Sequence, residues 1–157
     1  MIINISKQIQ KSYKMIGILK MYPIEGATQK DAVSYVSLLF SLASVDGVDE
    51  KELEAIKLLV SENGWSAEVY EEAKLNAGVT IDSLNLSPET VKVFGPYLIR
   101  DLCAIAHVSN GFSNQEDELI NTIREKVGVS SEKYSIIKIT VKAQLEAIDN
   151  WSKVLSA

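Results

Sequence analysis

The sequence contains one internal repeat, and this repeat restricts the chain to few folds. Residues 35–70 align with residues 99–134 at a constant offset and without a gap. The identical pairs are Leu38/Leu102, Gly47/Gly111, Glu52/Glu116, Glu54/Glu118, Ile56/Ile120, Gly64/Gly128, Ser66/Ser130, Glu68/Glu132 and Tyr70/Tyr134. They fall at turn glycines, cap serines, first-turn glutamates and apolar positions, where replacement is costly. We therefore expect one helix–turn–helix unit used twice and packed into a single core.

Apolar residues recur at helical spacing along most of the chain, which predicts an all-α fold. We expect helices over about 30–45, 49–63, 88–109, 114–127 and 134–155, and another beginning after Ser66. A further apolar stripe lies near the amino end, at Ile5, Ile9, Tyr13 and Ile16. Residues 77–87 form the least helical stretch, and Gly95-Pro96 predicts an interruption of the helix that contains it. Ile137–Val141 alternates like a strand, but the longer helical period outweighs this short run.

The composition of the chain limits the classes of protein to which it can belong. The chain has 157 residues, which fits a single domain over 1–157, and 46% of them are hydrophobic. A net charge of -5 argues against nucleic-acid binding, because phosphate neutralisation needs clustered Lys and Arg. Cys103 is the single cysteine, which excludes an intramolecular disulfide and fits a reducing compartment. No apolar run approaches the length of a membrane span, and no signal peptide is recognisable, so we expect a cytoplasmic protein.

Each repeat contains an acidic or polar elbow between its two helices. The first elbow is Asp46-Gly47-Val-Asp49-Glu50-Lys-Glu52, and the second is Asn110-Gly111-Phe-Ser113-Asn114-Gln-Glu116. Asp49-x-x-Glu52 and Ser113-x-x-Glu116 both match a helix capping box, in which cap and glutamate each satisfy a backbone N–H. The glycines suit the left-handed residue that ends a helix. Simple capping therefore explains most of both elbows.

Capping does not explain Asp46, which lies at the carboxyl end of a helix, where the dipole disfavours a negative charge. Together with Asp49, Glu50 and Glu52 it places four carboxylates in one short elbow. Hard divalent cations such as Ca²⁺ and Mg²⁺ prefer all-oxygen sites of this kind. The spacing differs from that of an EF-hand loop. Capping and cation binding both stay open for the first elbow, whereas Asn110 and Ser113 favour capping in the second.

Two other groups of residues could carry chemistry. Cys103 and His107 lie one helical turn apart, as two zinc ligands would. The repeat aligns them with the apolar Leu39 and Ala43, so we interpret them as core residues. We also interpret Trp65 and Trp151 as aromatic residues of the core or its rim.

The first elbow and its flanking helices resemble the tellurite-resistance TerB family and the related amino-terminal domain of DjlA-type co-chaperones. The likeness rests on Asp46-Gly47-x-Asp49-x-x-Glu52 after an apolar helix, and covers about residues 30–134. Asn110-Gly111-x-Ser113-x-x-Glu116 is similar to the family's second copy without its aspartates. The resemblance implies about seven helices in one TerB-like bundle and a non-enzymatic role in bacterial stress response. It implies metal ligands at Asp46, Asp49 and Glu52, with Glu116 contributing from the second copy.

These observations leave three functional hypotheses. The first is a TerB-like stress-response or interaction module that binds a divalent metal ion (Ca²⁺, Mg²⁺ or Zn²⁺) at the first elbow. The second is a structural adaptor whose apolar faces, including Trp151 or Phe112, bind partner helices. The third is a metal-dependent hydrolase that uses Asp46, Asp49 or Glu52, which would need a concave pocket. We expect protein partners, leave a homodimer open, and expect neither nucleic acid binding nor membrane insertion.

Overall fold

The computed structural model describes residues 24–78, 80–83, 88–108 and 112–156, and the protein is all-α over these ranges. The helices are α2 (Gln29–Ala43), α3 (Glu50–Glu62), α4 (Ala67–Leu75), the short 3₁₀ helix η1 (Ile81–Ser83), α5 (Pro88–Val108), α6 (Asn114–Lys126) and α7 (Ser131–Leu155). No strand occurs in the described ranges. The predicted fold class is therefore confirmed. The predicted amino-terminal stripe at Ile5, Ile9, Tyr13 and Ile16 lies outside these ranges.

The first unit consists of α2, α3 and α4. Thr28 caps α2, because its side chain accepts a hydrogen bond from the Asp31 backbone N–H. Residues of α2 are buried on nearly every side, since α2 contacts α3, α4, α5 and α6. The Phe40 ring of α2 meets the Tyr70 ring of α4 edge to face, with centroids 5.1 Å apart. Burial of α2 explains its continuous apolar sequence, which lacks a polar face.

The second unit consists of α5, α6 and α7, and α5 lies next to α2, α3, α6 and α7. Helix ends recur in the two units at the repeat offset. Asp49 and Ser113 are the N-caps of α3 and α6, each of which has 13 residues. Gly64 and Gly128 follow these helices with φ of 70° and 73°. These matching ends support the predicted duplication, which remains a prediction.

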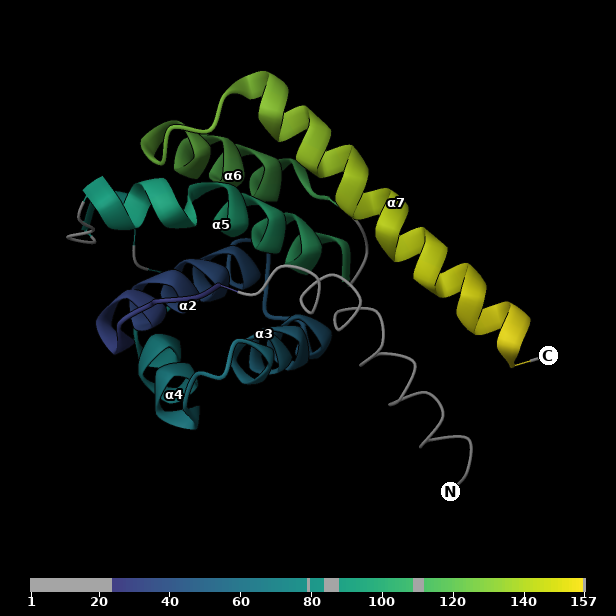
Figure 1. Ribbon diagram of the computed structural model, residues 1–157, viewed down its shortest axis with the longest axis horizontal. Coiled ribbons are helices and arrows are strands. Elements are labelled where there is room, and N and C mark those ends of the chain that lie inside the picture. The colour runs from purple at the N-terminus through teal and green to yellow at the C-terminus, as the bar shows by residue number, and fades with distance from the viewer. Residues whose placement is uncertain (1–23, 79, 84–87, 109–111, 157) are drawn as a thin grey trace.

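The core lies between the two units. Its largest fully buried side chains come from α2, α3 and α5: Tyr35, Leu38, Leu39, Phe40, Leu42, Ile56, Leu59, Leu98, Ile99, Leu102 and Ile105. Tyr35 is central, because its ring meets both Phe94 and Trp65 edge to face at 5.6 Å. Figure 1 shows α7 running past α5 and α6 and continuing beyond them, so that its carboxyl end lies away from the other labelled helices.

One expectation was wrong. The sequence predicted an interruption at Gly95-Pro96, but α5 runs unbroken from Pro88 to Val108 with Pro96 inside it. Contacts with four neighbouring helices hold α5 together, and such packing outweighs the local cost of a proline. Gly95 serves the packing instead, since a Cβ atom there would lie 3.0 Å from the Val127 carbonyl oxygen. In the described part of the chain, every helix is too short or too polar to cross a membrane.

Candidate functional site

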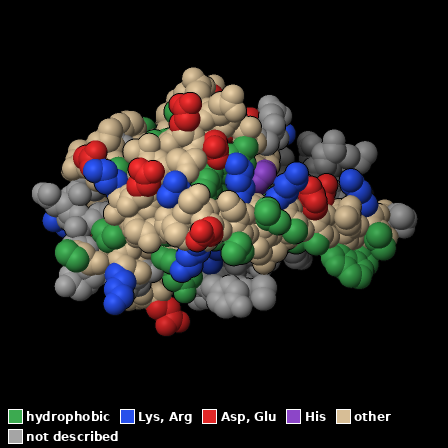
Figure 2. Space-filling view, turned by 90° about the horizontal axis from the view of Figure 1, so that it is seen from above, with side chains coloured by type: hydrophobic (Ala, Val, Ile, Leu, Met, Phe, Trp, Pro, Cys, Tyr) green, Lys and Arg blue, Asp and Glu red, His purple; other side chains and the backbone are tan. Residues whose placement is uncertain are grey.

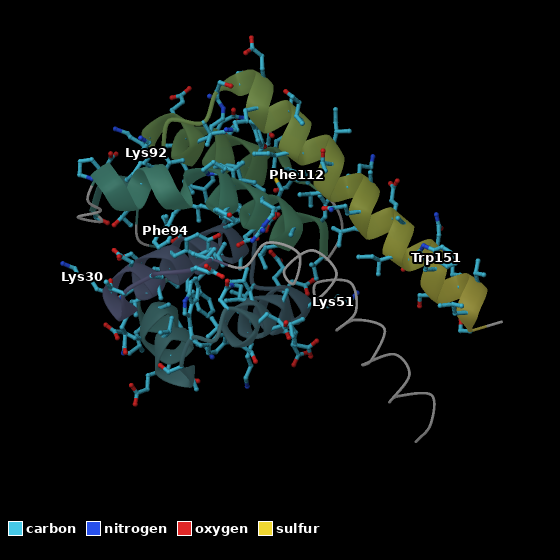
Figure 3. All side chains as sticks on the ribbon, in the orientation of Figure 1. Lys30, Lys51, Lys92, Phe94, Phe112 and Trp151 are labelled. Atoms are coloured by element: carbon cyan, nitrogen blue, oxygen red, sulfur yellow. The ribbon has the colours of Figure 1, made fainter. Side chains whose placement is uncertain are left out.

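The first elbow connects α2 to α3 by a tight turn. Ser44 is the C-cap of α2, and Gly47 has a φ of 109°, in the region that glycine adopts readily. The Asp49 side chain accepts a hydrogen bond of 2.7 Å from the backbone N–H of Lys51, which is labelled in Figure 3. Asp49 therefore acts as the N-cap of α3, as the capping interpretation predicts. The capping contact reaches Lys51, one residue before the Glu52 of the predicted box.

The second elbow contains a complete capping box. The Ser113 hydroxyl accepts from the Glu116 N–H at 3.1 Å, and the Glu116 carboxylate accepts from the Ser113 N–H at 2.9 Å. The predicted capping role of Ser113 and Glu116 is thus confirmed. Asn110 and Gly111 of this elbow lie outside the described residues.

The four predicted metal-site residues differ in their exposure. Asp46 is exposed and Asp49 is half-buried, whereas Glu52 and Glu116 are only 2% and 3% exposed. Burial raises the pKa of Glu116, although the two hydrogen bonds with Ser113 lower it, and the negative charge of Asp46 raises it further. The negative charge of Asp46, in the first elbow, thus acts in the same direction on Glu116 as burial does.

In the described ranges, no three His, Cys, Asp or Glu side chains gather closely enough to hold a metal ion. Asp49 and Glu116 each use a carboxylate oxygen to cap a helix. A cation bound here would rely on Asp46, which has no capping role. Cation binding therefore stays a proposal.

Cys103 belongs to the core, as predicted, because its side chain is fully buried in α5. Burial raises the pKa of its thiol to about 12, so the thiol is not ionised near neutral pH. His107, one turn further on, is half-buried and packs edge to face on Phe112 at 4.7 Å. Burial lowers the pKa of His107, and the nearby charges of Lys142 and Lys138 lower it further.

A buried polar network at the centre of the molecule was not predicted. The Tyr35 hydroxyl donates to one oxygen of Asp101 at 2.5 Å, and the Arg100 Nε donates to the other at 2.7 Å. Asp101 is fully buried. Burial and the charge of Asp101 raise the pKa of Tyr35 well above its usual value. The network joins α2 to α5. The signal available in the sequence was an acidic residue within the apolar run Leu98–Ala106.

A second polar cluster fastens the first half of α7 to α6. The carboxylate of Asp117 accepts hydrogen bonds from the Tyr134 hydroxyl at 2.6 Å and from the Lys138 ammonium at 2.8 Å. These two bonds lower the pKa of Asp117. Lys138 also lies 4.6 Å from the centre of the Phe112 ring. The start of α7 is thus firmly positioned against the body of the protein.

The far half of α7 carries an apolar surface that the body does not cover. One stripe of α7 begins with Tyr134 and Val141, which are 5% and 2% exposed. It continues through Ile148 to Trp151 and Leu155, which are 64% and 78% exposed. We call Ile148, Trp151 and Leu155 the distal stripe. Trp151 was expected in the core or at its rim, and this was wrong because α7 extends past the core (Figure 3).

No family model matches the chain, and neither do any of the curated proteins or solved structures with which we compared it.

Proposed function

We propose that the chain is a non-enzymatic interaction module of TerB-like type, whose distal stripe binds an amphipathic helix of a protein partner. The observation that carries the proposal is the change in exposure along α7. The same apolar stripe is buried where α7 crosses α5 and exposed where α7 leaves the body. An unpaired apolar helix face of this kind is suited to an incoming helix with apolar residues every three or four positions.

The helix that carries the distal stripe is anchored to the body at its first half. α7 is one uninterrupted helix of 25 residues, and its first half is held by Asp117 and by packing on α5. A partner would therefore meet a helix that is already formed and anchored at its first half, which lowers the backbone part of the entropic cost of binding. Trp151 would be the central contact, since tryptophan is enriched among the residues that dominate binding energy. The resemblance to TerB proteins extends the proposal to a role in bacterial stress response.

Site-specific photo-crosslinking in cells tests this function. A photoreactive residue at position 151 should form a covalent adduct with a second polypeptide. The same residue at position 153 serves as the matched control, because Lys153 is also exposed but points away from the distal stripe. Adducts at 151 and not at 153 are expected. No adduct at either position, or equal yields at both, would contradict the proposal.

Divalent cation binding at the first elbow is a second candidate function. It is supported by the exposed carboxylate of Asp46, which caps neither α2 nor α3 and lies in the same elbow as the carboxylates of Asp49 and Glu50. Calorimetric titration of Ca²⁺, Mg²⁺, Mn²⁺ and Zn²⁺ tests it. Binding should be lost in Asp46→Asn and kept in Glu132→Gln, which removes a carboxylate from the first turn of α7. Absence of binding by the parent protein would refute this candidate.

A further inference from the structure

The side of α7 that faces away from the body carries a second row of apolar residues. Its members recur at spacings of three, four and seven positions, which places them on one face of the helix: Ile136, Ile139, Ala143, Ala147 and Val154. We call these residues the outer row. All of them are exposed, and the exposed fractions of Ile136, Ile139 and Val154 are 65%, 68% and 66%. The outer row therefore lies open along most of α7, on a different face from the distal stripe.

The order of large and small residues in the outer row is nearly the same in both directions. Counted from position 145, Ala143 and Ala147 lie two residues to either side, and Ile136 and Val154 lie nine residues to either side. Small side chains at the centre let two helices approach closely, and larger side chains at the ends fill the space where crossing helices diverge. The outer row is thus complementary to a second copy of itself in the reversed direction, which is the arrangement that a twofold axis generates.

Charged side chains beside the outer row favour the same antiparallel arrangement. Lys142 and Glu146 are exposed and lie one helical turn apart, on the same flank of the row. In an antiparallel pair this flank meets the same flank of the second copy, so that Lys142 of each copy lies beside Glu146 of the other. A parallel pair would bring the flank against Thr140 and Gln144, which carry no charge. Figure 2 shows basic and acidic side chains beside the hydrophobic ones towards the end of the molecule to which α7 projects.

The bodies of two copies paired in this way lie on opposite sides of the helix pair. Tyr134 and Val141 are buried against the body on the face of α7 opposite to the outer row. Each body therefore lies behind its own α7, and the far half of α7 projects beyond it (Figure 1). The outer row extends over about 28 Å of helix. Two helices in contact over this length form a small interface, so we expect a dimer that dissociates on dilution.

We propose that the outer row binds a second copy of this chain, through antiparallel packing of α7 against α7 about a twofold axis near position 145. The inference goes beyond the proposed function, because the outer row and the distal stripe lie on different faces of α7. The dimer presents two distal stripes in a fixed relation to each other. A partner with two binding helices therefore binds the dimer more tightly than it binds one copy.

Light scattering of the full-length chain from micromolar to millimolar concentration tests this inference. The mass should rise with concentration from 17.3 kDa towards twice that value. Ile139→Asp should raise the dissociation constant about ten-fold or more, because the dimer would bury its carboxylate. Leu75→Asp is the matched control, since it makes the same kind of change at a residue of α4 that is 87% exposed. It should leave the dissociation constant unchanged.

Two further sets of variants test the orientation of the helices. Lys142→Glu and Glu146→Lys should each weaken the dimer, whereas the double variant Lys142→Glu/Glu146→Lys should restore it. A mixture of Ile136→Cys and Val154→Cys chains should form disulfide-linked dimers under air oxidation, and either variant alone should form few. The native Cys103 does not interfere, because it is fully buried.

Several results would overturn the inference. They are a parent chain that stays at 17.3 kDa at every concentration, a dimer that Ile139→Asp leaves intact, and a double charge variant that does not recover. Efficient linkage within Ile136→Cys alone would indicate a parallel pair and would also overturn it. Photo-crosslinking from position 151 tests the proposed function separately, since the mass of the adduct distinguishes a foreign polypeptide from a second copy. A monomer that forms foreign adducts would refute the dimer alone, whereas a dimer without them would refute the proposed function alone.

Discussion

The buried network of Tyr35, Asp101 and Arg100 allows a sharp prediction about stability. Tyr35→Phe removes one hydroxyl and leaves the ring contacts with Phe94 and Trp65 in place. Tyr35 and Asp101 are 2% and 0% exposed, so bulk water does not replace the lost donor. A hydrogen bond to a charged group contributes about 1.5–3 kcal/mol. We expect Tyr35→Phe to lower the free energy of unfolding by about 2 kcal/mol.

Urea unfolding followed by circular dichroism measures this change. With a slope of about 2 kcal/mol per molar urea, the midpoint should fall by about 1 M and the slope should stay the same. Asp101→Ala should cost more, about 3–5 kcal/mol, because it leaves the charge of Arg100 without its buried carboxylate. Tyr97→Phe is the matched control, since it keeps the ring that lies 5.1 Å from the Arg100 guanidinium.

The double variant Tyr35→Phe/Asp101→Ala completes a cycle. Because both substitutions break the same hydrogen bond, its destabilisation should be smaller than the sum of the two single effects by at least about 1 kcal/mol. Strict additivity would refute the reasoning, and so would a Tyr35→Phe midpoint equal to that of Tyr97→Phe. Either result would mean that the hydroxyl does not stabilise the carboxylate in solution.

Three further predictions concern caps, turns and titratable groups. Ser113→Ala should lower the free energy of unfolding by about 1 kcal/mol, whereas Ser66→Ala should have a smaller effect because Ser66 makes no side-chain capping bond. Gly47→Ala should cost about 1–2 kcal/mol in the same urea assay, since its φ of 109° strains any residue with a Cβ atom. His107 has a pKa below its usual value, so folding favours its neutral form. Its contribution is complete above the unfolded pKa of about 6.5 and is lost as pH falls through the lower folded value. The urea midpoint should therefore decrease on acidification more in the parent than in His107→Gln.

Local signals in the sequence were sufficient to predict the helix ends. A glycine with positive φ follows α3 and another follows α6, and serine or aspartate N-caps begin the helices after the elbows. These residues work through contacts with neighbours three or four positions away, so their meaning can be deduced without the fold. The predicted interruption at Gly95-Pro96 was wrong because it depends on contacts that are distant in sequence. Contacts with four other helices keep α5 continuous, and such contacts are invisible in a local pattern.

The candidate site was predictable only in part, because some of its contacts join residues that are distant in sequence. The elbow residues were identified correctly as caps at Asp49, Ser113 and Glu116. The influence of Asp46 on Glu116 could not be worked out from spacing, because it joins positions 70 residues apart. The partnership of Tyr35 with Asp101 is equally remote in sequence. An isolated charge in an apolar run indicates that a partner exists, but it does not say which residue that partner is.

The distal stripe shows which features of α7 the apolar spacing predicts and which it does not. The spacing from Tyr134 to Leu155 correctly indicates one apolar face, yet the face is buried at one end and exposed at the other. Apolar periodicity indicates that one face of a helix must be buried, but it does not indicate which element or partner buries that face.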